Sequence, residues 1–198
     1  MQNMETDGPE LTQHPEQVAA INPTRLALQM TDSGETLTYR ELADSANQIA
    51  RALMRLGVTA GDTIALLVPN GPSLFRLVWA AKNFGLRYVM VSARLNQADL
   101  EYIVRDSSAR LAITAQQFAT RMVPLADGSQ PLIVLVADGA HATLLDLTAL
   151  ANRHTSDPLP GRRRGSSMLY SSGTTGRPKG VQANLHDVPP EEPPSRHA

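Results

Sequence analysis

The 198-residue chain contains no cysteine, carries a net charge of only −1 and has no long apolar run. The lack of cysteine excludes disulfides and thiolate zinc sites. The balanced charge creates no field that would attract nucleic acid or an anionic membrane. No apolar run approaches the roughly 18 residues that span a bilayer, and the polar N-terminal segment lacks the apolar core of a secretory signal. We therefore expect a cytoplasmic protein with no membrane span and no nucleic-acid partner.

What the chain does contain is enough apolar material for one folded domain. Hydrophobic residues make up 42% of the sequence and charged residues 19%, which is ordinary for a globular protein. Residues 1–20 are polar and lack periodicity, so we expect a flexible N-terminal arm. Residues 184–198 are rich in proline and lack a core-forming pattern, so we expect a disordered tail. Residues 21–183 remain as the folded part.

The segment after Leu37 has the clearest helical pattern. Thr38 and Glu41 have the spacing of a capping box. Apolar residues continue from Leu42 at helical spacing, and Gly57 stands where a left-handed C-terminal cap is expected. These signals predict a helix between Thr38 and Gly57.

Strand-like and helix-like segments then alternate. The run TIALLV at residues 63–68 is apolar without alternation, which is typical of a strand covered on both faces. Pro72 opens a helix that Gly85 ends, and Trp79 within it is expected to pack in the core rather than on a ligand. Similar signals predict strands at 26–30, 36–37, 88–91, 111–114, 131–136 and 167–170, and helices capped by Asn96, Thr114 and Thr143. This order predicts an α/β fold in which helices flank a parallel sheet.

The segment YSSGTTGRPKG, from Tyr170 to Gly180, combines glycines, hydroxyl side chains and a lysine directly after a predicted strand. Glycines allow a backbone to approach a ligand closely, and successive N–H groups in such a turn form an anion site. Hydroxyls add hydrogen-bond donors, and Lys179 adds a positive charge. The segment therefore predicts a loop that cradles a polyphosphate. The alternative is a flexible linker of the same composition.

The spacing within this loop separates it from two better-known phosphate loops. A Walker A loop requires G-x-x-x-x-G-K-[ST], whereas Lys179 stands three residues beyond Gly176 and is followed by Gly180. The G-x-G-x-x-G fingerprint of dinucleotide-binding folds is also absent. In a parallel sheet, the loop after a strand lies at the carboxyl end, where ligands bind.

No other cluster in the sequence predicts a catalytic or metal site. The five histidines show no metal-ligand pairing, and Glu191 and Glu192 are neighbours in the proline-rich tail rather than an acid/base pair. We interpret the arginines at 162–164 as a solvated surface rather than a phosphate contact. We therefore assign no catalytic residue and no metal ligand.

Residues 170–181, YSSGTTGRPKGV, resemble the phosphate loop of the adenylate-forming (AMP-binding) enzymes. These are the acyl-CoA synthetases, firefly luciferase and the adenylation domains of peptide synthetases. Three upstream blocks resemble the early part of that family in the expected order: LTYRELADSANQIARALMRLGV at 37–58, GDTIALLVPN at 61–70 and LEYIVRDSSARLAIT at 100–114. The tyrosine before SSGTTG favours the acyl-CoA ligases. Residues 21–183 are thus identified as a partial N-terminal domain of the adenylate-forming enzyme fold.

This resemblance implies a two-step reaction. A carboxylate attacks the α-phosphorus of ATP, which is bound with Mg²⁺, to give an acyl-adenylate and pyrophosphate. A thiol, typically coenzyme A, then takes the acyl group. By the same resemblance the nucleotide phosphates are bound by Ser171, Ser172, Gly173, Thr174, Thr175, Gly176 and Lys179.

The chain departs from the family pattern after this loop. Members of the family are much longer, and no segment beyond Val181 resembles those that hold adenine, ribose or Mg²⁺, or the small C-terminal domain with its catalytic lysine. One hypothesis is a truncated AMP-dependent ligase, for which a complementary fragment encoded downstream would supply the rest. The other is a non-catalytic remnant or phosphate-binding module, which we favour for the chain acting alone. A different nucleotide hydrolase is a third interpretation, and nothing in the sequence selects an acyl substrate.

Overall fold

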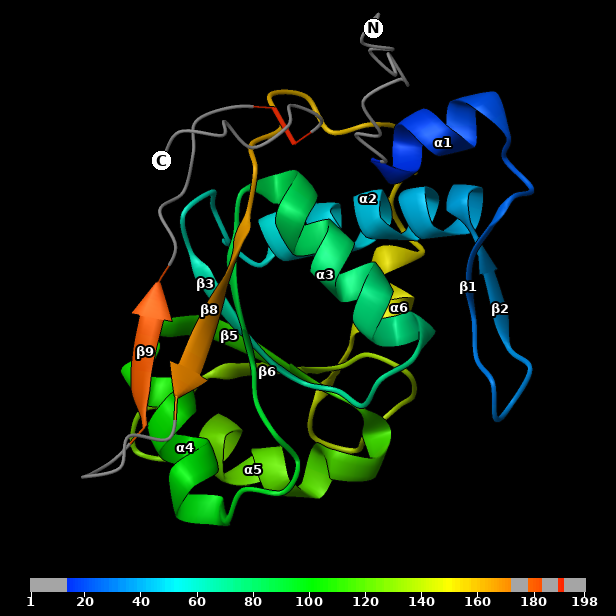
Figure 1. Ribbon diagram of the computed structural model, residues 1–198. Coiled ribbons are helices and arrows are strands. Elements are labelled where there is room, and N and C mark those ends of the chain that lie inside the picture. The colour runs from blue at the N-terminus through cyan, green and yellow to red at the C-terminus, as the bar shows by residue number, and fades with distance from the viewer. Residues whose placement is uncertain (1–13, 172–177, 183–188, 191–198) are drawn as a thin grey trace, which may run out of the picture.

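The computed structural model describes residues 14–171, 178–182 and 189–190 of the chain (Figure 1). In chain order its elements are α1 Pro15–Ile21, β1 Leu26–Gln29, β2 Thr36–Thr38, α2 Tyr39–Arg55, β3 Thr63–Leu67, α3 Pro72–Phe84, β4 Arg87–Met90, α4 Gln97–Asp106, β5 Ala109–Thr114, the 3-10 helix η1 Gln116–Phe118, α5 Ala119–Asp127, β6 Ile133–Val136, β7 Leu145–Asp146, α6 Leu147–Ala151, β8 Ser166–Ser171 and β9 Lys179–Gln182. The expected proline-rich tail at 184–198 lies almost entirely outside the described residues.

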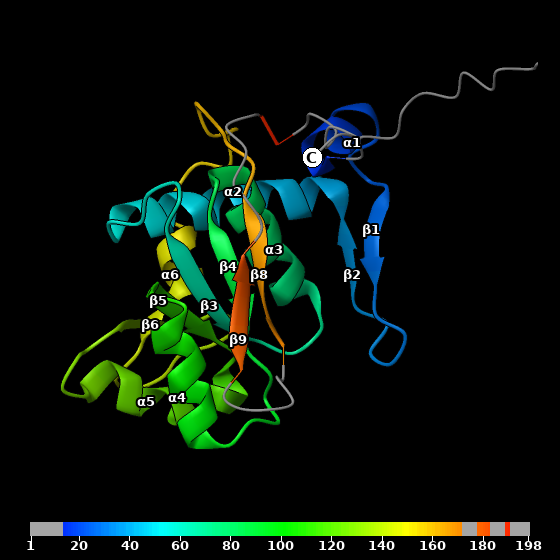
Figure 2. The ribbon, with the colours of Figure 1, turned by 60° about the vertical axis from the view of Figure 1, so that its left-hand side comes forward.

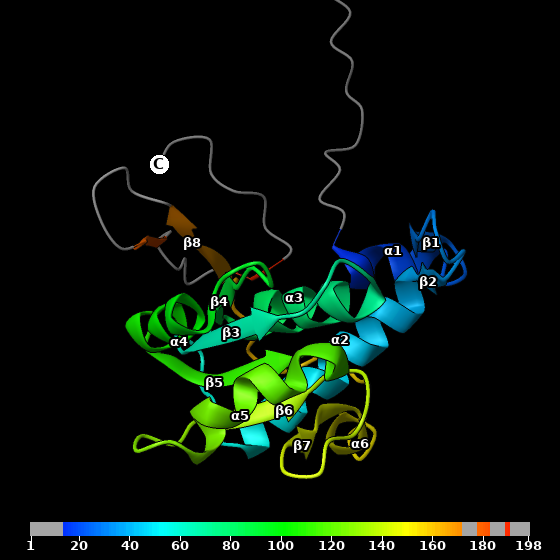
Figure 3. The ribbon, with the colours of Figure 1, turned by 90° about the horizontal axis from the view of Figure 1, so that it is seen from below.

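A seven-stranded sheet forms the centre of the described part of the chain, in the order β7-β6-β5-β3-β4-β8-β9. All neighbours from β7 to β8 pair in parallel, which confirms the predicted parallel sheet. The edge strand β9 instead pairs antiparallel with β8. A separate antiparallel hairpin, β1 and β2, lies beside α1 and one end of α2 (Figure 3).

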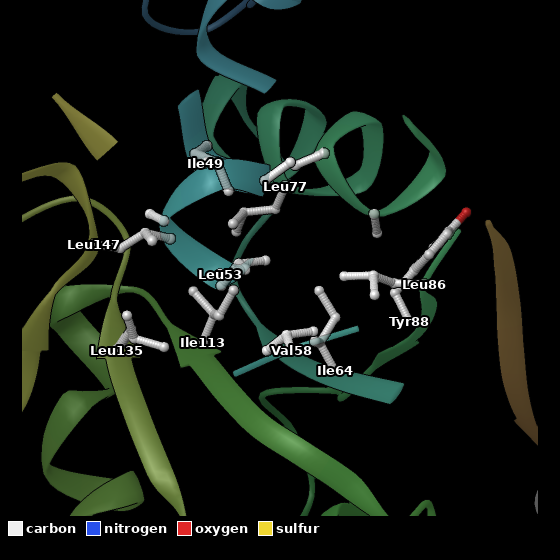
Figure 4. Close-up of a cluster of buried hydrophobic side chains, with 14 of the residues drawn as sticks. Ile49, Leu53, Val58, Ile64, Leu77, Leu86, Tyr88, Ile113, Leu135 and Leu147 are labelled. Carbon is white, nitrogen blue, oxygen red and sulfur yellow. The ribbon is translucent and has the colours of Figure 1, made fainter. Parts of the chain in front are cut away.

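Helices cover both faces of the sheet, because the strands have apolar side chains on both faces, as β3 illustrates. Its residues alternate between two clusters: Ile64 and Leu66 pack with α2, α3 and α6, while Ala65 and Leu67 pack with α4 and α5. Figure 2 shows the two groups of helices on opposite sides of the strands, and Figure 4 shows part of the first cluster. All five residues of β3 are buried, as expected for a parallel strand with both faces covered.

The helix ends predicted at Thr38, Gly57, Gly85 and Asn96 are confirmed. Thr38 caps α2, with the Glu41 N–H donating to Thr38 Oγ1 at 3.2 Å and the Thr38 N–H donating to Glu41 Oε2 at 2.8 Å. Gly57, just after α2, has φ of +82°, and Gly85 ends α3 with φ of +72°. Both lie in the left-handed region that favours glycine. Asn96 caps α4 by accepting from the Asp99 N–H at 2.9 Å.

The N-terminal arm expected over residues 1–20 differs from the structure in its second part. Residues 14–20 belong to a capped helix, α1, that packs on the domain. His14 is 3% exposed and is hydrogen-bonded through Nε2 to Asn83 Oδ1 at 2.8 Å. Its ring also meets the edge of Trp79 at a centroid distance of 5.4 Å. This anchor joins residues 69 positions apart, so no local sequence pattern reveals it.

Two predicted helix caps are wrong. Thr114 does not cap a helix, because its hydroxyl donates to the Leu67 carbonyl at 3.3 Å and ties β5 to the end of β3. The last helix, α6, is capped by Asp146, whose Oδ1 accepts from the Ala149 N–H at 2.9 Å. Thr143 is not its cap, because Leu145 and Asp146 form the short strand β7 before the helix begins. Trp79 is partly buried against the core, as predicted.

Candidate functional site: the β8–β9 hairpin

The predicted phosphate loop joins β8 to β9. The strands pair in register, with Ser171 opposite Lys179 and Tyr170 opposite Gly180. The predicted site residues Ser172, Gly173, Thr174, Thr175 and Gly176 lie outside the described residues, so the structure places only the two ends of the loop. Ser171 is the last residue of β8, and the exposed Lys179 is the first of β9. The hairpin therefore brings these two predicted residues together as cross-strand partners.

The hairpin begins where a ligand site is expected in this fold. Because β8 runs parallel to β4, the backbone of Ser171 lies at the carboxyl end of the parallel strands. In open α/β sheets, ligands bind outside this edge. The return strand β9 begins at the same edge, because its first residue, Lys179, pairs with Ser171. Lys179 forms no ion pair with any residue that the structure describes.

Two tyrosines attach this hairpin to α4. Tyr170, on β8, donates its hydroxyl to Asp106 Oδ2 at 2.7 Å, and Tyr102 donates to the Pro178 carbonyl at 3.3 Å. Tyr102 and Asp106 are four residues apart, so they share one face of α4. The two bonds hold the strand before the loop and the residue just after it. Sequence reasoning missed these anchors, although both lie in the block at 100–114 that was noted only for its resemblance.

The phenol of Tyr170 stays protonated in this environment. Burial raises its pKa, and the hydrogen bond to Asp106 and the negative charge of that carboxylate raise it further. A protonated phenol is a hydrogen-bond donor at neutral pH. Tyr170 therefore anchors the hairpin by donation and does not act as a base.

Gly180 leaves room for two side chains of β8, Met168 and Tyr170, to pack against β9. A Cβ atom at this position would lie 2.3 Å from Met168 Cε and 3.1 Å from Tyr170 Cζ. The Tyr170 ring thus occupies the space above its cross-strand partner. A larger residue here would force the Met168 side chain and the Tyr170 ring to shift, so packing favours glycine.

The described residues fit a phosphate site better than a metal site. Lys179 offers an ammonium group at the end of the hairpin, and backbone N–H groups of a turn bind anions. In the described part of the chain, no three histidine, aspartate or glutamate side chains are grouped to hold a metal ion. Nor does any described helix have the length and apolar character to cross a membrane.

Comparison with known proteins identifies the class. Residues 11–187 match the family model of the AMP-binding enzymes, so the chain belongs to this family. It is 32% identical over 175 residues to a 2-succinylbenzoate–CoA ligase of Bacillus licheniformis, covering 86% of this chain and 34% of that protein. It is also 30% identical over 156 residues to gramicidin S synthase 2 of Aneurinibacillus migulanus, covering 78% of this chain and 3% of that protein.

Solved structures show the same fold. The crystal structure of the anthranilate CoA ligase AuaEII with anthranoyl-AMP superposes with a TM-score of 0.74 at 25% identity, covering 89% of this chain and 34% of that one. The inhibitor-bound N-terminal domain of FACL13 from Mycobacterium tuberculosis gives a TM-score of 0.71 at 26% identity, covering 87% of this chain and 42% of that one. The chain spans about a third of the length of the CoA ligases that it matches.

Proposed function

We propose that this chain supplies the ATP phosphate-binding part of an enzyme that activates a carboxylic acid as an acyl-adenylate and transfers the acyl group to coenzyme A. The observation that carries the proposal is the β8–β9 hairpin, which places Ser171 and Lys179 opposite each other at the carboxyl edge of the sheet. Membership of the AMP-binding family supports it. So does the presence of several CoA ligases among the relatives.

In this proposal the loop acts by position and charge. The hydroxyls and backbone N–H groups of Ser171–Gly176 hold phosphate oxygens, and Lys179 neutralises the charge that develops as pyrophosphate departs. Tyr170 and Tyr102 hold the two described ends of the loop against α4. Mg²⁺ would enter as the counterion of ATP and neutralise its phosphates, with no ligand assigned among the described residues.

The groups that bind adenine and the acyl chain come, in this proposal, from outside the described residues. A complementary polypeptide is one source, and the cytoplasm, which holds ATP and coenzyme A, is the proposed setting. A phosphate-binding module without turnover is the second candidate. It is favoured by Lys179, which is exposed and forms no ion pair with a described residue.

The test is pyrophosphate release from ATP with a panel of carboxylic acids, alongside ATP binding measured by calorimetry. Lys179→Met removes the charge and keeps the aliphatic stem, and Lys82→Met, at a half-buried lysine of α3 over the Trp79 ring, is the control away from the hairpin. Turnover that Lys179→Met abolishes and Lys82→Met retains supports the ligase.

Each other outcome has a distinct meaning. ATP binding that depends on Lys179, without turnover, supports the phosphate-binding module. Hydrolysis of ATP without any carboxylate supports the third interpretation, a nucleotide hydrolase. Absence of both binding and turnover, also after co-expression with a complementary fragment, overturns the proposal.

A further inference from the structure

A second candidate site lies on the face of the sheet opposite α4, where α2, α3 and α6 meet. A cavity of about 180 Å³ opens between these helices. Its inner wall is apolar and includes Ile49 from α2, Leu77 from α3 and Leu147 from α6, which Figure 4 shows within one cluster. An apolar cavity of about 150 Å³ is known to hold a benzene molecule. The inner part of this cavity therefore fits a small hydrocarbon group.

The rim of the cavity carries an arginine without a hydrogen-bond partner. Arg76, on α3, lines the cavity, and its Nε atom is buried with no partner among the described residues. Arg76 also forms no ion pair with them. A buried donor that lacks an acceptor costs free energy, and a charged one costs more. The arrangement therefore favours a ligand that brings an acceptor, ideally a carboxylate, which matches the guanidinium fork.

The other polar side chains at the cavity divide into two groups. Three already donate to backbone carbonyls: Ser45 to Glu41 at 2.6 Å, Gln48 to His154 at 3.0 Å and Thr148 to Ala137 at 2.9 Å. Their hydrogen-bond donors are therefore in use.

The half-buried Ser73 and the exposed Asn152 line the same cavity, and neither side chain is hydrogen-bonded to a described residue. Ser73 precedes Arg76 by three positions, so the two lie on one face of α3. Ser73 therefore offers an unused hydroxyl on the same helix face as the arginine.

The first turn of α3 adds an electrostatic field that favours a bound anion. This helix has 13 residues, and its N-cap, Gly71, offers no side chain to the first N–H groups. Ser73 lies in that turn, where the helix dipole favours an anion. The lining of the cavity contains no acidic residue. Outside the lining, the hydrogen bonds from Thr38 lower the pKa of Glu41, and the charge of Arg76 lowers it to a smaller extent.

The topology places this cavity at a position where α/β sheets bind ligands. β3 and β5 are neighbours, yet the chain leaves β3 toward β4 and leaves β5 toward β6, in opposite directions along the sheet. Ligands bind outside the carboxyl ends of strands at such a switch point. Ser73 and Arg76 follow the carboxyl end of β3, and Ala137 follows that of β6. The cavity therefore has part of its lining at the carboxyl ends of strands on either side of β5, and none of its lining comes from the β8–β9 hairpin.

We propose that this cavity binds a small organic carboxylate, with its carboxyl group on Arg76 and Ser73 and a short hydrocarbon body against Ile49, Leu77 and Leu147. The site does not rest on the proposed phosphate loop. The cavity volume of about 180 Å³ corresponds to about six water-sized groups, at about 30 Å³ for each group. Benzoate and hexanoate are suitable probes, because their hydrocarbon bodies of six and five carbons match this volume.

The experiment measures binding of benzoate and hexanoate to the 198-residue chain by ligand-observed NMR and by the shift in melting temperature. Benzamide and hexanamide are the neutral controls, and inorganic phosphate tests for simple anion binding. Arg76→Gln is expected to weaken carboxylate binding about tenfold or more, because a charged hydrogen bond is lost. Arg94→Gln, at an exposed arginine outside the cavity, is the matched control and keeps full affinity.

A second variant protects the test against a simple folding defect. Ala137→Leu fills the cavity and keeps Arg76, so it is expected to abolish binding of both probes while circular dichroism shows a folded chain. Lys179→Met is expected to leave carboxylate binding unchanged, which separates this site from the phosphate loop. Any of four results overturns the proposal: equal affinity for the acids and their amides, binding of phosphate alone, full affinity in Arg76→Gln, or no binding of either probe. The last is tested at about 10 mM probe, well above a millimolar Kd.

Discussion

The first and last elements of the described chain are attached to the same domain by different kinds of contact. At the N-terminal end, α1 is held by a buried hydrogen bond from His14 to Asn83, each at most 3% exposed, and by part-buried bonds from Glu16 to Arg162 and to Asn47. At the C-terminal end, β9 is held by backbone pairing with β8, and the hairpin is tied to α4 by two tyrosine hydroxyls.

The difference lies in how much water each contact excludes. A buried hydrogen bond is costly to break because its partner is left without water, whereas an exposed one exchanges with solvent at little cost. Leu169 and Val181, which pair across the hairpin, are 59% and 62% exposed. The element that carries the predicted ligand loop is therefore the less firmly held of the two, as is usual for elements that act on ligands.

The largest effect is expected at the buried end. Asn83→Ala removes the partner of the His14 ring, and we expect it to lower the free energy of unfolding by about 2–3 kcal/mol. Urea denaturation measures this, with the exposed Asn70→Ala as control. Amide exchange of α1 is expected to rise in Asn83→Ala while that of β9 stays unchanged. If Asn83→Ala loses no more free energy of unfolding than Asn70→Ala, the N-terminal helix is held no more firmly than the hairpin.

Gly180→Ala comes next. Its new Cβ would meet Met168 Cε and the Tyr170 ring, so one of them has to move, at a cost of about 1–2 kcal/mol. Urea denaturation of the single variant and of the double variant with Tyr170→Leu gives the coupling. We expect the alanine to cost less when the ring is absent, and a cost that is the same in both backgrounds contradicts the packing argument.

Tyr170→Phe has a smaller effect with a characteristic pH dependence. Loss of the hydroxyl bond to Asp106 is expected to cost about 0.5–1 kcal/mol at pH 7. Because the pKa of Tyr170 is raised in the folded chain, its contribution is fully present below the unfolded value of about 10. It is lost as pH rises further, since the unfolded state then releases the proton first.

The measurement is urea denaturation at pH 7 and at about pH 11, where an ordinary tyrosine is ionised. The wild type is expected to lose more stability over this interval than Tyr170→Phe. Part of the loss remains in the variant, because burial also raises the pKa of Tyr88. Tyr39→Phe is the control, and the hypothesis fails if both variants show the same dependence on pH.

Tyr102→Phe is expected to have the smallest effect, a few tenths of a kcal/mol, because its bond to the Pro178 carbonyl is long at 3.3 Å. The informative readout is ATP affinity rather than stability. If the bond positions the end of the loop, the affinity falls while the free energy of unfolding hardly changes. An unchanged affinity would remove Tyr102 from the anchoring scheme.

The parts of the fold that were predictable from sequence are those with local causes. The caps at Thr38 and Asn96 and the glycines at 57 and 85 act within one helical turn, so residue type and spacing are enough to predict these helix ends. The buried strand β3 was readable because a strand covered on both faces is apolar without alternation.

The parts that were missed depend on distant partners. The helix α1 rests on Asn83, and Thr114 bonds to Leu67 across two strands instead of capping a helix. At the candidate site, sequence identified the loop and Lys179 but not the anchors on α4. Nor did it single out Arg76, because an arginine on a helix is unremarkable until the structure shows that it has no partner.

The position of β8 in the sheet has a consequence for how the chain folds during synthesis. β4 lies between β3 and β8, but β8 follows it by about 80 residues, which the ribosome makes in several seconds at about 5–20 residues per second. Until then one edge of β4, including the apolar Val89, has no strand to pair with. Closing the sheet is therefore a late and non-local event, and the nascent chain passes through an interval in which this edge can bind other strands.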